Sequence, residues 1–147
     1  MTNKKWEHFE IETGFCVKGT GASKREAFEN AAMSVASLVI DPNIVRGLNG
    51  LFIDCEAEND EDLLEYWINS IIREMEDRKM IFAKFHVYLE KPKLRGQAWG
   101  EPIDSRRHKL LAKLSKTKKE DRIVRQISPH IWLAQCGIDL ERKIILN

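Results

Sequence analysis

The segment at residues 23–39, SKREAFENAAMSVASLV, has the pattern of a helix with a defined start. Ser23 and Glu26 form a capping box, in which each side chain accepts a hydrogen bond from a backbone N–H group that the helix start leaves unpaired. Apolar residues then recur every three or four positions, the spacing that gives a helix one buried face. Pro42 follows soon after and cannot continue a helix. The sequence therefore predicts a helix over residues 23–39.

The residues before this helix alternate between apolar and polar side chains from position 6 to position 18. A period of two over this length predicts a single β-strand with one buried face. Gly19-Thr20-Gly21 is expected to end that strand. Its polar face carries Glu10 and Glu12, which form either part of a binding site or an exposed surface.

The rest of the chain adds one helix and several strands. Residues 59–62 place acidic side chains at a second helix start, where the helix dipole favours them, and an apolar stripe continues to Met75. Strands are predicted at residues 51–57, 81–89 and 93–101 and, within the segment 122–138, at residues 122–127 and 130–136. Consecutive late strands favour antiparallel pairing. The expected fold is α+β: one domain over residues 1–147, with two helices packed on an antiparallel or mixed β-sheet.

The composition fits a single domain. The chain has 147 residues, of which 43% are hydrophobic and 32% charged, and a net charge of +1. This charge gives no global attraction to nucleic acid or membrane, and no segment has the pattern of a signal peptide or a membrane span. Cys16, Cys55 and Cys136 are scattered without metal-ligand spacing. They predict reduced thiols in a cytoplasmic protein without membrane contact.

Charge is unevenly distributed along the chain. Residues 54–65 contain seven acids and no base, whereas residues 106–125 contain nine Lys or Arg residues against two acids. The basic segment is either a solvated face or a docking patch for RNA or an acidic protein surface. It lacks the interleaved aromatic residues that favour RNA binding. The candidate docking residues are Lys113, Lys116, Lys118, Lys119 and Arg122.

No catalytic signature is found in the sequence. It has no Walker loop, no GxGxxG and no GxSxG motif, and its four histidines lie far apart. The sequence patterns therefore give no support for an enzyme, and we expect a protein that is not one.

Several segments, in this order and spacing, resemble the archease family over about residues 6–140. They are the opening KKWEHFE, the helix SKREAFENAAM at 23–33, the helix DLLEYWINSII at 62–72, the strand IFAKF at 81–85, AWGEPID at 98–104 with the following Arg107 and His108, and WLAQ at 132–135 before IDL at 138–140. The resemblance implies an α+β protein that assists the GTP-dependent RNA ligase of tRNA splicing without catalysing ligation itself.

The resemblance also implies a metal site. In the family, an Asp on the first strand and an Asp near the C-terminus bind the metal. These positions fall here on Gly14, which has no carboxylate, and on Asp139. The candidate ligands of Ca²⁺ or another divalent cation are therefore Asp139, the carbonyl of Leu140 and, at a shifted site, Glu12. Residues 141–147 extend past the family's usual end. The alternative is that the site is lost and the strand face is merely solvated.

The family's ligase-activating lysine falls on Ser115, with Lys116 one position away. Glu26, expected at the same end of the fold as Asp139, is a further candidate for ligase activation. The favoured hypothesis is a protein cofactor that promotes activation or turnover of an RNA ligase in tRNA splicing or RNA repair, with a degraded metal site. The alternative is a metal-free RNA- or protein-binding module on the same fold.

Overall fold

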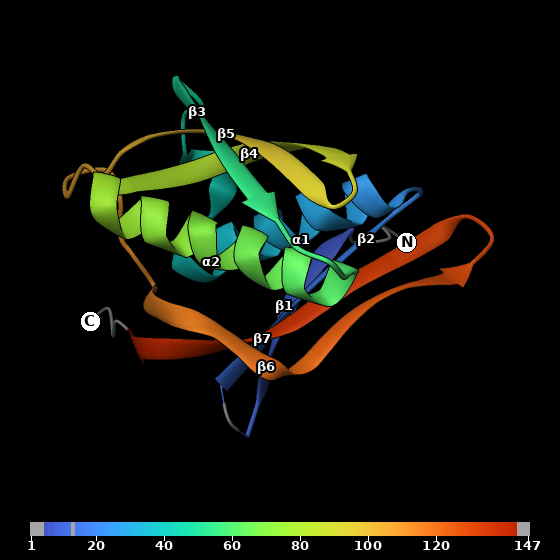
Figure 1. The fold of residues 1–147 in the computed structure, drawn as a ribbon. Helices are drawn as coiled ribbons and strands as arrows, with labels where there is room; N and C mark the ends of the chain where they lie inside the picture. The colour runs from blue at the N-terminus through green and yellow to red at the C-terminus, as the bar shows by residue number, and fades with distance from the viewer. Residues whose placement is uncertain (1–4, 13, 144–147) are drawn as a thin grey trace.

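The protein consists of two helices enclosed between two antiparallel β-sheets (Figure 1). A computed structural model describes the backbone of residues 5–12 and 14–143, and the side chains of all of these except residues 120, 142 and 143. The expected α+β class is confirmed. The expected single sheet is replaced by two, so the helices form a middle layer and not an outer one.

The four-stranded sheet has the order β1-β2-β7-β6, and the three-stranded sheet has the order β3-β5-β4. The helices are α1 (Lys24–Val39) and α2 (Asp60–Arg78), and a short 3₁₀ helix η1 (Pro42–Ile44) follows α1. The strands are β1 (Trp6–Ile11), β2 (Gly14–Gly21), β3 (Asn49–Glu56), β4 (Met80–Glu90), β5 (Lys93–Pro102), β6 (Ala112–Ser128) and β7 (Ile131–Lys143).

Both helices begin where their sequences predict. The Ser23 hydroxyl accepts a hydrogen bond from the backbone N–H of Glu26, and the Asn59 side chain accepts one from Asp62. Helix α2 ends at Lys79, whose φ of 53° is left-handed. Neither helix, as far as the described residues extend, combines the length and hydropathy needed to cross a membrane.

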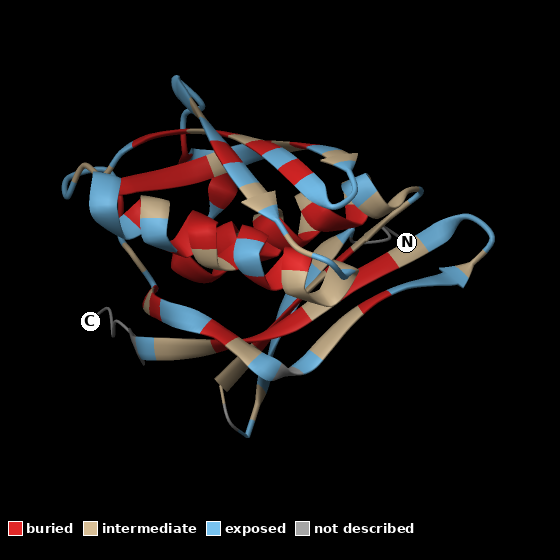
Figure 2. Ribbon diagram, viewed as in Figure 1, coloured by how far each residue is buried: buried red, intermediate tan, exposed pale blue. Residues whose placement is uncertain are grey.

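Helix α1 is buried over more than one face, because it contacts both sheets. Its neighbours include β2 in one sheet and β4 in the other, while α2 lies against β6 and β3 (Figure 1). Figure 2 shows buried residues along both helices and on the strands that cover them. The apolar residues of α1 therefore fill the space between two sheets, which explains why small side chains such as Ala31 and Ala36 are fully enclosed.

The single strand predicted over residues 6–18 is wrong. Residues 6–11 and 14–21 form two strands of a hairpin, in which Glu10 pairs with Phe15 and Trp6 pairs with Gly19. The connection between them contains Glu12, and Thr13 lies outside the described residues. Alternation continues through the turn and therefore hides it. Gly14 follows this connection, and its φ of +144° is a backbone conformation that residues with an L side chain rarely adopt.

The strand β2 continues through Gly19 and ends at Gly21, so the predicted break at residues 19–21 is two residues early. At both glycines α1 packs directly on the strand backbone. A Cβ atom on Gly19 would lie 2.1 Å from the Ala31 nitrogen, and one on Gly21 would lie 2.4 Å from the Glu26 Cβ. These glycines therefore mark close helix–strand packing.

Trp67 connects the helix layer to the three-stranded sheet. Its side chain is fully buried, and its Nε1–H donates a hydrogen bond to the Phe28 carbonyl of α1 at 3.1 Å. Its ring meets the edge of the Phe85 ring, with centroids 6.0 Å apart. On β5 the ring covers Gly96, where an added Cβ would lie 2.0 Å from the Trp67 Cζ3 atom. One side chain thus links α2, α1, β4 and β5.

Replacing Trp67 with alanine should destabilise the protein by about 3–5 kcal/mol, because it empties a large volume in the core. That is a substantial fraction of the usual free energy of unfolding, about 5–15 kcal/mol. Urea denaturation monitored by circular dichroism measures the change. Tyr66→Ala, at the exposed neighbouring position on the same helix, is the matched control and should stay within about 0.5 kcal/mol of wild type. Equal losses in the two variants would contradict the central role of Trp67.

Candidate functional site

A polar hollow between α2 and the β6–β7 pair brings together four of the candidate residues, Lys116, Lys118, Lys119 and Asp139. Its volume is about 760 Å³. Its lining is Glu65 and Asn69 of α2, Lys116, Thr117, Lys118, Lys119 and Asp121 of β6, and Asp139 of β7. The candidate metal ligand Asp139 therefore lies beside three of the five candidate docking residues.

A β-bulge sets which lysine faces Asp139. Along the β6–β7 ladder, Leu114 pairs with Leu140 and Lys116 pairs with Asp139, so Ser115 is the extra residue. Bulges re-aim side chains and are frequent beside functional sites. Ser115 and Lys116 are both exposed. The bulge places Lys116, and not Ser115, directly across the ladder from Asp139.

Lys118 forms an ion pair with Asp139. The Lys118 Nζ atom lies 3.2 Å from Asp139 Oδ1. The lysine side chain is 15% exposed and the aspartate side chain 37% exposed, so the ammonium group is the more enclosed partner. Partial burial weakens solvent screening and makes this pair stronger than a pair on an open surface.

Gly14 lies beside the same pair. A Cβ atom built on Gly14 would lie 2.7 Å from the Ile138 carbonyl oxygen and 3.7 Å from Lys118 Nζ. The first distance is too short for a real Cβ atom, and the φ of +144° disfavours any L side chain. The backbone here therefore excludes a carboxylate at position 14, and the lysine ammonium occupies the neighbouring space.

These residues do not fit a divalent metal site. Calcium takes six to eight oxygen ligands, and a lysine ammonium offers none. Glu12 is exposed in the β1–β2 connection, and Leu140 is half-buried in β7. Across the described residues, no three His, Cys, Asp or Glu side chains gather around one point. Binding of Ca²⁺ or another divalent cation stays a prediction from the resemblance.

Glu26 lies at the opposite end of β2 from Gly14, so its expected place beside Asp139 is wrong. Its side chain accepts a hydrogen bond from the Ala22 backbone N–H at 2.8 Å and completes the cap of α1. Gly21, which it adjoins, is seven residues along the strand from Gly14, roughly 23 Å at 3.3 Å per residue.

The predicted docking patch is divided by ion pairs with acids. Lys113 pairs with Glu76 and Glu141, and Arg122 pairs with Asp62 and Glu65. Lys118 pairs with Asp139, and Lys116 and Lys119 are the two exposed members of the patch. The five cations therefore do not form one continuous positive surface.

Sequence patterns missed a polar network that joins α2 to β6. The Thr117 backbone N–H donates to Asn69 Oδ1 at 2.8 Å, and the Thr117 hydroxyl donates to Glu65 Oε1 at 3.3 Å. Arg122 donates to Glu65 Oε2 at 3.0 Å and also to Asp62. The bond from Arg122 lowers the pKa of Asp62. The available signals were the opposite charges of residues 54–65 and 106–125 and the polar Asn69, which lies four positions after the buried Glu65.

A second polar cluster fixes the loop that leads into β6. The Arg107 guanidinium donates a hydrogen bond from Nη1 to Oε1 of the buried Glu101 at 2.7 Å. The Arg46 backbone N–H donates to Oε2 of the same carboxylate at 2.5 Å. His108 is buried, and its Nδ1 accepts from the Asp104 backbone N–H at 2.8 Å. The bonds from Arg107 and Arg46 lower the pKa of Glu101 to about 2. This cluster fixes the conformation of the loop between β5 and β6 and lies outside the polar hollow.

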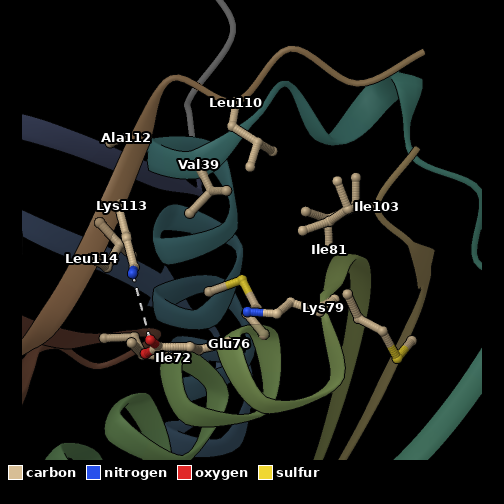
Figure 3. A pocket seen from close by; sticks show the side chains of 12 residues that line it. Val39, Ile72, Glu76, Lys79, Ile81, Ile103, Leu110, Ala112, Lys113 and Leu114 are labelled. Atoms are coloured by element: carbon tan, nitrogen blue, oxygen red, sulfur yellow. Dashed lines mark ion pairs between the residues drawn. The ribbon is translucent and has the colours of Figure 1, made fainter. Parts of the chain in front are cut away.

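A separate, mainly apolar cavity of about 240 Å³ lies where α1 and α2 end and β6 begins (Figure 3). Val39, Ile81 and Leu110 contribute apolar walls. Lys79 and the Glu76–Lys113 ion pair add charge to its lining. Its lining suits an apolar group, and its one carboxylate, Glu76, is paired with Lys113.

All three cysteines are free thiols, in agreement with the sequence. Cys16 and Cys136 are buried and Cys55 is half-buried. Burial raises the pKa of Cys16 to about 11 and that of Cys136 to about 12. Neither buried thiol is poised to react as a nucleophile.

Glu101→Gln should lower the melting temperature at neutral pH and reduce its dependence on acid. The folded-state pKa of Glu101 is about 2, below its ordinary 4.5, so its contribution is full above pH 4.5 and is lost as the pH falls towards 2. Thermal melts from neutral pH down to about pH 2 should show the wild type and the variant converging. Glu90→Gln, at an exposed position, is the control. A constant difference at all pH values would contradict this assignment.

Comparison with known proteins identifies relatives along nearly the whole chain. Residues 6–139 match the Archease protein family (MTH1598/TM1083). A protein archease from Pyrococcus abyssi is 26% identical over 141 residues, covering 93% of this chain and 99% of that protein. One from Sulfurisphaera tokodaii is 32% identical over 107 residues, covering 71% and 77%.

Solved structures have the same fold. The solution structure of protein 1598 from Methanobacterium thermoautotrophicum superposes with a TM-score of 0.82 at 21% identity, covering 94% of this chain and 100% of that one. The crystal structure of an archease and possible chaperone from Thermotoga maritima gives 0.57 at 12% identity, covering 89% and 94%. With a family match over residues 6–139 and this fold, the chain belongs to the archease family.

Proposed function

We propose that this archease-family protein is an accessory factor that promotes activation and turnover of a GTP-dependent RNA ligase in tRNA splicing or RNA repair. It acts in the cytoplasm and does not catalyse ligation itself. Family membership over residues 6–139 supports an accessory role. The polar hollow supplies the surface at which we propose that the ligase docks.

The observation that carries this proposal is the bulge at Ser115. It presents Lys116, exposed, directly across β6–β7 from Asp139. The resemblance implies a ligase-activating lysine at the position of Ser115, one residue before Lys116. Because Lys118 already pairs with Asp139, the flexible ammonium of Lys116 can contact a phosphate or a carboxylate of the partner. Lys119, also exposed, extends the same rim of the hollow.

The same function does not require an intact metal centre in this chain. Position 14 has no side chain, and Lys118 neutralises Asp139. We therefore propose that the metal site of the family is degraded here and that ligase contact depends on side chains of β6 and β7. Without a carboxylate at position 14, the Lys118–Asp139 ion pair takes over the positioning of this surface, and Lys116 keeps its place on β6.

The test is multiple-turnover RNA ligation by the GTP-dependent ligase of the same organism, with and without this protein. Wild type should raise the number of turnovers. Lys116→Ala should reduce the stimulation about tenfold, as expected when a charged contact of about 1.4 kcal/mol is lost. Lys84→Ala, an exposed lysine on the opposite sheet, is the matched control and should stimulate like wild type.

Two results would contradict the proposal. One is full stimulation by Lys116→Ala in a protein whose melting temperature is unchanged. The other is no stimulation by wild type while the ligase alone ligates its substrate. The second result would favour the other candidate function below.

The second candidate is a metal-free binding module for a protein partner. The apolar cavity supports it, because a mainly hydrophobic lining with charge from Lys79 and the Glu76–Lys113 pair suits an apolar side chain of a protein better than RNA. The division of the basic patch by acids also weakens the case for RNA, which needs unbalanced positive charge along its backbone.

A further inference from the structure

Three groups meet at the end of the four-stranded sheet where β2 begins. They are the bare backbone of Gly14, the carboxylate of Asp139 and the ammonium of Lys118. The ladder brings them together, because Phe15 pairs with Ile138 and Lys116 pairs with Asp139. Lys118 Nζ is 3.2 Å from the carboxylate and 3.7 Å from the place where a Gly14 Cβ would lie. The Lys118 ammonium therefore lies between the Asp139 carboxylate of β7 and the place that a Gly14 side chain on β2 would take.

Within the Lys118–Asp139 ion pair the two charges balance without a metal ion. Two carboxylates and one divalent cation sum to zero, and one carboxylate and one ammonium also sum to zero. Replacing the acid at position 14 with glycine removes one negative charge. A divalent ion added to Asp139 alone would leave an excess positive charge next to Lys118, which repels it. The present residues thus favour an ammonium over a divalent ion.

The backbone also opposes a return to the two-acid arrangement. Any side chain at position 14 would meet the Ile138 carbonyl oxygen at 2.7 Å and require a φ of +144°. Lys118 is the more buried partner of the ion pair, so its position is set by packing as well as by charge. Both features point to an arrangement built around the lysine.

We propose that Lys118 is a built-in cation, whose ammonium group takes the place of a divalent metal ion between β2 and β7. Wild-type stability is then independent of divalent cations. The lysine also holds Asp139 in a fixed position across from Lys116. This inference does not rest on ligase activation, since its readouts are stability and cation binding in the isolated protein.

The test compares thermal melts in EDTA and in millimolar CaCl₂ or MnCl₂, together with calorimetric titration of CaCl₂. Wild type should show the same melting temperature in all conditions and no heat of binding. Lys118→Met keeps the apolar stem but removes the charge, and should lower the melting temperature in EDTA by roughly 2–4 °C. Added divalent cation should restore part of this loss, because it binds the exposed carboxylate of the folded state.

Matched variants identify the cause of any change. Lys119→Met, one position along the strand and exposed, should behave like wild type. The double variant Lys118→Met with Asp139→Asn removes both charges and should show no cation response. Lys118→Arg keeps the charge, should also show no cation response, and serves as the readout if Lys118→Met fails to fold.

Specific results would overturn the proposal. Calcium binding by wild type that Asp139→Asn abolishes would mean that a metal ion binds despite the lysine. Equal melting temperatures of Lys118→Met and Lys119→Met in EDTA would mean that the Lys118–Asp139 ion pair does not stabilise the fold. A cation response by Lys118→Arg like that of Lys118→Met would mean that shape, and not charge, is the cause. Each outcome is independent of whether the protein stimulates a ligase.

Discussion

The burial of two helices between two sheets is the constraint on which the structure depends, and Trp67 is its centre. The indole bonds the Phe28 carbonyl of α1 at 3.1 Å and covers Gly96 of β5. A helix layer that is enclosed on both sides must be apolar around most of its circumference and must approach the strands closely. Glycines in β2 and β5 and alanines in α1 provide that approach, so side-chain size and fold are tied together.

The polar hollow exists because α2 is held against β6 by hydrogen bonds as well as by apolar contacts. Thr117 and Asn69 exchange bonds with each other, and Arg122 reaches across to Glu65. The acidic start of α2 and the basic segment of β6, far apart in sequence, therefore neutralise each other in part. Of the five candidate docking cations, Lys116 and Lys119 are left exposed at the rim of the hollow.

The candidate site residues Asp139, Lys116 and Gly14 were suggested by the resemblance to the archease family, and the structure brings them to one end of the four-stranded sheet. The sequence did not predict that Lys118 pairs with Asp139 or that Ser115 is the extra residue of a bulge. Both depend on strand register, which is set by contacts between β6 and β7 that no local pattern records. Glu26 was misplaced for the same reason, since β2 separates it from Asp139.

By itself, the sequence determined both helices with their caps, the strand character of most remaining segments, the α+β class and the family, because these follow from local periodicity and ordered motifs. Only the tertiary structure decided that residues 6–21 form a hairpin and that the sheet is divided in two. It also decided which charges neutralise one another. The physical reason is that such features depend on which strands pair and which side chains meet across the fold, and therefore on residues more than a hundred positions apart, such as Gly14 and Ile138.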